Sequence, residues 1–179
     1  MAEETSDDAA GPEPEPEPVP ETVYGAPVTM SRGQKVAHPA RETLADLVGG
    51  LRAVDGFKSC VDVTAVDYYA HPGRPDLPAG VRPERYEVVV SLLSHTSRTR
   101  LRLRVQVPED DPVVPSLFDI HPGTEALERE VFDLFGIRFD GHPDMTRIIM
   151  PEDWIGHPLR KDYAIGAIPV QFKGVADAR

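Results

Sequence analysis

Hydrophobic and polar residues alternate along two neighbouring stretches of the chain, a pattern that predicts two β-strands. In "TRLRLRVQVP" (residues 99–108) every second residue is apolar: Leu101, Leu103, Val105 and Val107 alternate with Arg100, Arg102, Arg104 and Gln106. One face of this strand should therefore be buried, and the other should carry a row of cations. The run "RYEVVVSLLSH" supplies a second strand, and "SHTSRT" joins the two as a hairpin. The cationic row fits a solvated face, or a surface that meets acidic groups.

A period of three to four residues replaces the alternation in two other stretches and predicts helices. Residues 122–136 form the clearest one, with apolar side chains at i, i+4, i+7 and i+8. Thr124 can cap its start, and Gly136 supplies the left-handed residue that ends a helix. A similar apolar face in "PARETLADLVGGLRAV" predicts a shorter helix that begins near Pro39. Between this helix and the hairpin, "SCVDVTAVDYY" alternates as another strand, and "HPGRPDLPAGVRP" is typical of a loop.

After Gly136 the pattern keeps neither period for long. Residues 137–179 contain many apolar and aromatic side chains, and prolines interrupt them at Pro143, Pro151, Pro158 and Pro169. Long irregular segments are uncommon in compact domains unless they have a function, and disordered segments are poor in aromatic residues. We therefore expect residues 138–179 to form an extended arm whose apolar side chains are buried against another chain.

Charge divides the chain into unequal parts. The net charge is −11, yet residues 1–30 hold eight acids and no base, which leaves 22 acids and 19 bases for the rest. The stretch "PEPEPEPVPE" cannot bury a core, so we expect residues 1–36 to be a disordered, solvated tail; a docking arm for a basic partner is the alternative. Residues 37–137 then make one domain. The nearly balanced charge of residues 31–179 argues against a nucleic-acid partner.

Two further absences narrow the function. No apolar run approaches the length of a membrane span, and the acidic N-terminal stretch lacks the features of a secretory signal, so direct membrane insertion is not expected. Cys60 is the only cysteine, which excludes a disulfide within the chain and the usual four-cysteine iron–sulfur site. We expect no catalytic, cofactor-binding or metal-binding residue in this chain.

Two clusters of polar residues are candidates for chemistry. His142, Asp144 and His157 could bind a metal, but no pair has the i, i+4 spacing of a metalloprotease helix, and both histidines lie in Gly-His-Pro turns. Glu128 and Glu130 lie two apart on a helix and cannot face each other, so they should border the apolar stripe and form ion pairs. Within the same helix, Arg129 can reach Asp133 as a weak surface pair.

The same region carries a resemblance to a known family. "LEREVFDLFGIRFDGHPDMTRIIMPEDWIGHPLRKDY" is similar to the signature of the 30-kDa subunit of respiratory complex I, the family of the C subunit of NADH-quinone oxidoreductase. The motif residues, which we also expect to serve the interface, are Glu128, Arg129, Glu130, Asp133, Gly136, Gly141, His142, Pro143, Asp144, Arg147, Trp154, His157, Arg160, Lys161, Asp162 and Tyr163. The chain departs from the family pattern at Ala126 and His121, where tryptophans are usual.

The resemblance implies an α+β fold: a two-layer domain with a small mixed or antiparallel sheet covered by helices, plus the extended arm. It also implies a structural subunit without its own cofactor, beside the 49-kDa-type (D) subunit in the cytoplasmic arm of the complex. FMN and Fe–S clusters in partner subunits would carry electrons from NADH to quinone and drive proton translocation. The chain would lie peripherally, on the cytoplasmic side of the inner membrane.

Two alternatives stay open from the sequence. Within the same architecture, the chain could serve a ferredoxin- or deazaflavin-dependent dehydrogenase or a membrane-bound hydrogenase, because it does not bind the electron donor. The alternative from a different class is a freestanding metal-dependent hydrolase that uses His142, Asp144 and His157.

Overall fold

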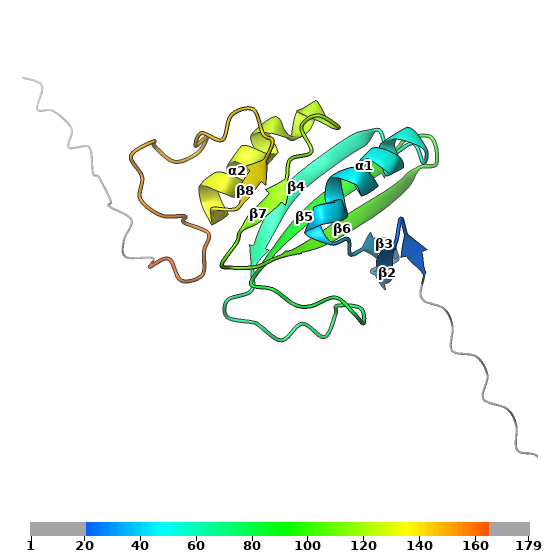
Figure 1. Ribbon diagram of the computed structural model, residues 1–179, viewed down its shortest axis with the longest axis horizontal. Helices are drawn as coiled ribbons and strands as arrows, with labels where there is room; N and C mark the ends of the chain where they lie inside the picture. The colour runs from blue at the N-terminus through cyan, green and yellow to red at the C-terminus, as the bar shows by residue number, and fades with distance from the viewer. Residues whose placement is uncertain (1–20, 165–179) are drawn as a thin grey trace, which may run out of the picture.

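Residues 21–164 are described by the computed structural model, and they form a mixed sheet with two helices (Figure 1). The sheet has six strands in the order β1-β2-β3-β6-β5-β4. Their bounds are β1 Thr22–Val23, β2 Ala26–Ser31, β3 Gln34–Ala37, β4 Ser59–Asp67, β5 Tyr86–Ser94 and β6 Thr99–Val107. A separate parallel pair is made by β7 (Val113–Pro115) and β8 (Arg138–Asp140). The expected α+β class is confirmed.

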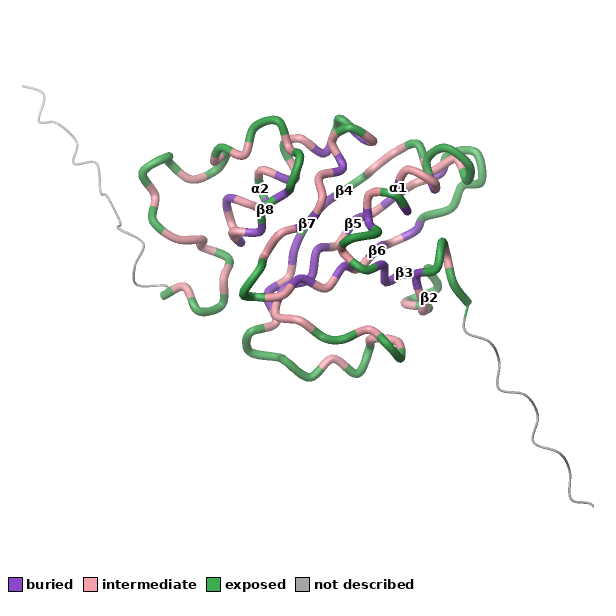
Figure 2. Tube along the Cα trace, in the orientation of Figure 1, coloured by how far each residue is buried: buried purple, intermediate pink, exposed green. Residues whose placement is uncertain are grey.

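The predicted hairpin is the centre of the sheet. Strands β5 and β6 pair antiparallel over their whole length, from Tyr86 opposite Val107 to Ser94 opposite Thr99. The apolar residues of β6 are buried and the intervening residues are not, as the alternation predicts (Figure 2). Strand β4 pairs antiparallel with β5, whereas β3 pairs parallel with β6, which makes the sheet mixed.

Both predicted helices contribute to the core on the inner face of the sheet. Helix α1 (Leu44–Ala53) buries Leu44, Leu47, Val48 and Leu51. Helix α2 (Glu125–Phe135) follows a 3-10 turn (η2, Pro122–Thr124), and another such turn (η1, Arg41–Thr43) precedes α1. Val131 and Phe135 of α2 share one hydrophobic cluster with the sheet residues. Gly136 ends α2 at φ 75°, in the left-handed conformation that the sequence predicts.

The predicted boundary between the N-terminal tail and the folded domain is wrong. Strands β1, β2 and β3 occupy residues 22–37, most of which the sequence interpretation assigned to a tail over 1–36. The β2–β3 turn has positive φ at Arg32 and Gly33, as tight hairpin turns require, and Val36 and Ala37 are fully buried beside β6. The run of acids ends at Glu21, so grouping residues 1–30 by composition hid this hairpin. Residues 1–20 lie outside the described residues.

On the other face of the sheet, the row of cations is only partly solvated. Arg104 donates to the buried carboxylate of Glu87 at 2.7 Å and pairs with Asp76 at 2.6 Å. Arg74, from the loop between β4 and β5, donates to the other Glu87 oxygen at 2.7 Å. Arg104, one of the cations of this row, therefore forms ion pairs with acidic groups of its own chain. Further along β6, Arg100 and Arg102 form no ion pair within residues 21–164.

The Glu87 cluster generates a stability prediction. Glu87→Gln keeps the shape of the side chain but leaves the buried Arg74 and Arg104 with only the half-exposed Asp76 as an anion. We expect the free energy of unfolding, measured by urea titration, to fall by about 3 kcal/mol. The matched control is Glu84→Gln, which breaks only the exposed pair with Arg82 and should cost less than about 1 kcal/mol. Equal losses in the two variants would contradict the assigned role of the cluster.

Candidate functional site

The motif residues gather where the chain after β8 folds back along α2. We call residues 141–163 the arm segment; it contains no helix or strand and runs along the outside of α2 (Figure 1). It is held in three places: at the start of α2, at the end of α2, and at the edge of the sheet.

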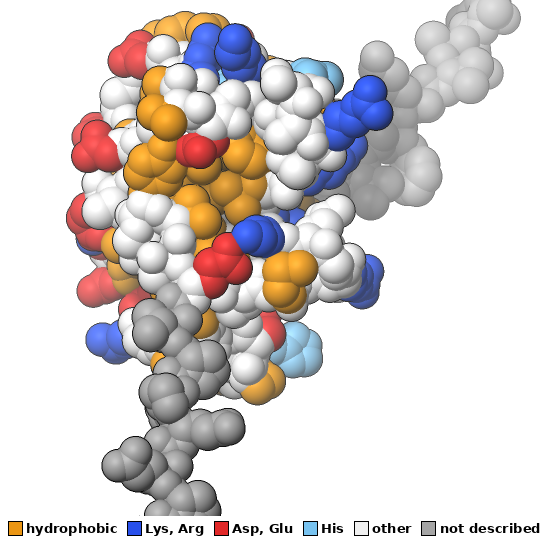
Figure 3. Space-filling model, turned by 90° about the vertical axis from the view of Figure 1, so that its right-hand side faces the viewer, with side chains coloured by type: hydrophobic (Ala, Val, Ile, Leu, Met, Phe, Trp, Pro, Cys, Tyr) orange, Lys and Arg blue, Asp and Glu red, His pale blue; other side chains and the backbone are white. Residues whose placement is uncertain are grey.

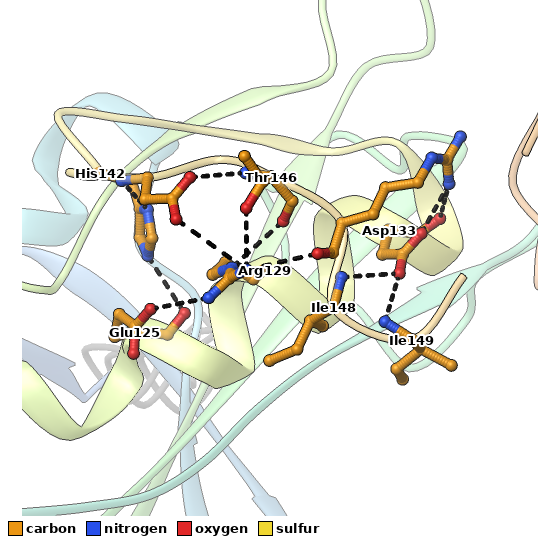
Figure 4. Close-up of polar contacts among 9 residues, drawn as sticks. Glu125, Arg129, Asp133, His142, Thr146, Ile148 and Ile149 are labelled. Carbon is orange, nitrogen blue, oxygen red and sulfur yellow. Dashed lines mark hydrogen bonds and ion pairs between the residues drawn. The ribbon is translucent and has the colours of Figure 1, made fainter. Parts of the chain in front are cut away.

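Asp133 is the main attachment point. Its side chain is fully buried. Arg147 Nη1 donates to Oδ1 at 2.6 Å, and the backbone N–H groups of Ile148 and Ile149 donate to Oδ2 at 3.1 and 2.7 Å (Figure 4). The backbone N–H of Met150 donates to the same oxygen at 2.8 Å. The other Arg147 nitrogen, Nη2, donates to the carbonyls of Trp154 and Gly156, both at 2.9 Å. Four consecutive residues of the arm segment thus converge on one carboxylate.

The surroundings of Asp133 favour its charged form. Burial alone would raise the pKa of this carboxyl, because it removes the charge from water. The Met150 N–H, the Arg147 guanidinium and the Ile149 and Ile148 N–H groups outweigh burial, and the pKa lies below its usual range. The carboxylate is therefore ionised at neutral pH, with every donor already supplied by the chain itself.

The last carbonyls of α2 are capped by the next stretch of the arm segment. A helix leaves its final carbonyl groups without partners from its own backbone pattern. His157 Nδ1 donates to the Asp133 carbonyl at 2.9 Å, the Leu159 N–H to Leu134 at 3.0 Å and Arg160 Nε to Phe135 at 2.6 Å. The Arg160 cation also suits the negative end of the helix dipole. Burial, aided by the nearby Arg160 and Arg147 charges, lowers the pKa of His157, so its ring is neutral at pH 7.

Gly136 makes this close approach feasible. A Cβ added there would lie 2.6 Å from His157 Nε2 and would also clash with the Arg160 guanidinium. Gly156 has a related role, because its Cβ would lie 2.7 Å from the Tyr163 ring. Both glycines also have positive φ. Each motif position therefore favours glycine for two reasons: the left-handed backbone conformation and the lack of space for a side chain.

At the other end of α2, a second set of contacts surrounds Arg129. Arg129 donates to the Thr146 carbonyl at 3.1 Å, to the Thr146 hydroxyl at 2.8 Å and to Glu125 at 3.1 Å (Figure 4). The predicted pair with Asp133 is therefore wrong: Arg129 reaches one turn back, toward Glu125. His142 donates from Nε2 to the Glu125 carbonyl at 3.1 Å, and its Nδ1 accepts the Asp144 N–H at 3.0 Å.

These positions exclude the metal-site alternative for the residues that the structure describes. His142 contacts the first residue of α2 and His157 contacts its last turn, so the two histidines lie at opposite ends of the helix. Both His142 nitrogens are engaged by backbone groups, and within residues 21–164 no three His, Cys, Asp or Glu side chains form a group that could hold a metal ion. The hydrolase built on His142, Asp144 and His157 is not supported.

Glu128 and Glu130, the two candidate carboxylates of α2, differ in exposure. Glu130 is exposed, whereas Glu128 is fully buried. Instead of the expected ion pair, Glu128 accepts hydrogen bonds from the Ser116 hydroxyl at 2.6 Å and from the Leu117 N–H and Thr124 hydroxyl, both at 2.8 Å. Thr124 therefore does not cap α2 with its side chain. Glu128 ties the loop before α2 to the helix.

The third attachment was not foreseen from the sequence. Asp67, buried at the end of β4, accepts the Lys161 N–H at 2.8 Å and pairs with Arg85 through both oxygens, at 3.1 and 3.0 Å. Arg85 also pairs with Asp162 at 2.8 Å. Asp67 and Lys161 are 94 residues apart, and neither position carries a local signal of the other. Of the two positions where the family has tryptophans, His121 is buried and Ala126 is exposed.

Within residues 21–164, these contacts fix the arm segment as a surface along α2. The polar groups described above face α2 and the sheet, and they are occupied by partners in the same chain. Four large apolar side chains of the arm segment are exposed: Ile148, Ile149, Ile155 and Leu159 are 43%, 54%, 89% and 43% exposed. Met145, in contrast, packs against the core. A segment fixed on one side and apolar on the other is suited to binding another protein.

Gly136 provides a test of the arm's attachment. Gly136→Ala should strain the left-handed backbone by about 1–2 kcal/mol and also displace His157 and Arg160, which releases the arm segment. We expect faster limited trypsin cleavage after Arg147, Arg160 and Lys161. Gly141→Ala is the control, because it has the same backbone strain (φ 84°) but nothing within 4 Å of the new Cβ. If both variants are cleaved at the same rate, the close approach at Gly136 does not hold the arm.

Comparison with known proteins agrees with this geometry. The model of the family "Respiratory-chain NADH dehydrogenase, 30 Kd subunit" matches residues 37–168. The chain is 44% identical over 149 residues to the C subunit of NADH-quinone oxidoreductase from Saccharopolyspora erythraea, a match that covers 82% of this chain and 56% of that protein. For the same subunit from Mycobacterium sp. (strain KMS) the identity is 47%, over 82% of this chain and 60% of that protein. The chain thus spans less than two thirds of these relatives.

Solved structures share the fold. A trypsin-resistant fragment of Nqo5 superposes with a TM-score of 0.60 at 35% identity, covering 68% of this chain and 90% of the fragment. A chain of the archaeal membrane-bound sulfane sulfur reductase reaches 0.59 at 23% identity, over 86% of this chain and 90% of that chain, which shows a common fold alone. On the family match and these identities, the chain belongs to the 30-kDa subunit family of the respiratory-chain NADH dehydrogenase.

Proposed function

We propose that this chain is the C component of an NADH-quinone oxidoreductase and that it acts as a structural part of the complex. One observation carries the proposal: the arm segment is fixed to its own domain by polar contacts and turns its isoleucines outward. Family membership supplies the context, since the matched relatives are named as this subunit. NADH oxidation and quinone reduction would take place in other subunits, which hold the FMN and the Fe–S clusters.

The proposed partner at the arm segment is the 49-kDa-type (D) subunit. The core of a protein interface is mainly apolar. A loop that is already ordered before binding favours high affinity, because ordering it during association costs free energy. The contacts to Asp133 and to the end of α2 provide that order in advance. Arg160, one of the residues predicted to contact the partner, has a different role in this proposal. Its Nε donates to the Phe135 carbonyl, so Arg160 positions the arm segment and its guanidinium is not free to bind a partner carboxylate through two parallel hydrogen bonds.

The proposed location follows from the same assembly. We propose that the chain is held at the cytoplasmic side of the inner membrane through its partner subunits. Within residues 21–164 no helix is long and apolar enough to cross a bilayer.

The interface proposal predicts the effect of removing exposed apolar groups. Ile155→Ser and Ile149→Ser should leave the unfolding transition of the isolated chain nearly unchanged, because both side chains are more than half exposed. Affinity for the 49-kDa-type subunit should fall by about tenfold or more per substitution, the loss that corresponds to an isoleucine no longer buried on binding. The measurement is recovery of partner subunits with the tagged chain from membranes, combined with titration of the purified partner.

Val54→Ser is the matched control, because Val54 is 78% exposed but follows α1, away from the arm segment. It should copurify with the same partners as the unaltered chain. Normal recovery of partner subunits by the Ile149 and Ile155 variants would overturn the interface assignment. Copurification with subunits that lack a flavin-binding NADH-oxidising partner would instead overturn the proposed complex.

A further inference from the structure

A groove lies at the end of the molecule opposite the arm segment. It has a volume of about 900 Å³ and runs between the β1–β3 strands, the end of α1 and the turn of the β5–β6 hairpin. Its apolar lining includes Val23, Tyr24, Phe57, Leu93 and Leu101. Figure 3 looks onto this end and shows hydrophobic side chains gathered in its middle, with Lys and Arg side chains along part of the margin and Asp and Glu side chains along another part. Such a lining could accept an apolar or proline-rich chain.

The margin of the groove carries three cations, two of which form no ion pair within the described chain. Lys35, Arg98 and Arg100 line it. Neither arginine forms an ion pair with an acid among residues 21–164, whereas Arg104, further along β6, pairs with Glu87 and Asp76. Clustered cations beside an apolar floor attract an acidic ligand and strengthen its binding at low salt.

An acidic segment begins at this groove. Thr22 and Val23, the first strand of the sheet, are part of the lining, so the preceding residues leave the described structure at the groove itself. The last acid of that segment, Glu21, already pairs with Lys35 at the margin. Residues 1–20 add seven acids and no base, and five prolines alternate with other residues from Pro12 to Pro20. Charge and position therefore point to the same occupant.

We propose that residues 1–20 bind in this groove of their own chain, with glutamates on Arg98 and Arg100 and prolines on the aromatic floor. The distances allow it. Twenty residues of extended chain reach about 60 Å at about 3.1 Å per residue. Tethering also gives the segment an effective concentration in the millimolar range, so weak contacts suffice.

This binding gives the segment a defined role that does not depend on the proposed complex. An occupied groove covers apolar surface at this end of the domain, and an acidic chain from another protein could enter only by displacing residues 1–20. A second copy of the chain is the competing occupant, because its own acidic segment has the same chemistry.

Paramagnetic relaxation in the full-length chain tests the proposal. A spin label is attached at Ala10→Cys in a Cys60→Ser background, and the amide signals of Leu93 and Thr99 at the groove are compared with those of Tyr86 and Val107 at the far end of the hairpin. In about 10 mM salt, where the screening length is about 30 Å, we expect selective broadening at Leu93 and Thr99. In about 1 M salt, where that length is about 3 Å, the broadening should disappear.

Charge variants separate the groove from a general electrostatic effect. Arg98→Gln with Arg100→Gln should abolish the broadening, as should Gln at Glu13, Glu15 and Glu17, which leaves the described domain untouched. The control variant, Arg82→Gln with Arg138→Gln, removes the same amount of positive charge from exposed positions outside the groove. The broadening should persist in this variant. Uniform broadening, or broadening confined to residues 21–23, would overturn the proposal. Broadening of an isotope-labelled chain by a separate spin-labelled chain would overturn it in favour of a second copy.

Discussion

A carboxylate that is buried away from water needs hydrogen-bond donors for its oxygens. The C-terminal end of a helix likewise needs hydrogen-bond donors for its last carbonyl groups. Both needs arise in the final turn of α2, at Asp133 and at the three carbonyls of residues 133–135. The arm segment meets them with the Arg147 guanidinium, three consecutive N–H groups and the side chains of His157 and Arg160. Its path is therefore set by hydrogen-bond donors, although it has no regular secondary structure.

This constraint also decides what the arm segment shows to its surroundings. Because the polar groups of residues 147–160 are directed to α2, the side chains of Ile148, Ile149 and Ile155 remain outside. A second anchor, at Asp67 and Arg85, fixes the segment again at Lys161 and Asp162. The irregular segment is therefore fixed at both ends and presents an ordered apolar surface. Because this surface is ordered before binding, it favours tight association with a partner protein.

The sequence predicted those features that local patterns determine. The β5–β6 hairpin, both helices and the left-handed Gly136 follow from periods of two and 3.6 residues and from the steric freedom of glycine. The β1–β3 strands were missed because they join the sheet only through β3, which pairs parallel with β6 at a separation of more than 60 positions. Charged residues were harder still. Asp133 finds mainly backbone donors, which have no side-chain signature, and Glu128 is satisfied by two hydroxyls and an N–H where an ion pair was expected.

Amide hydrogen exchange of Ile148, Ile149 and Met150 tests the central claim, that the Asp133 carboxylate holds the arm segment. The folded-state pKa of Asp133 is lowered, so its stabilising effect is complete above the unfolded value of about 3.9 and is lost as pH falls through the folded value. We expect Asp133→Asn to remove protection at these three amides at pH 7 but to leave the β5–β6 amides protected. The difference from the unaltered chain should disappear in strong acid, while Asp153→Asn, at an exposed position of the same segment, should have no effect. Unchanged protection of the three amides in Asp133→Asn would contradict the claim.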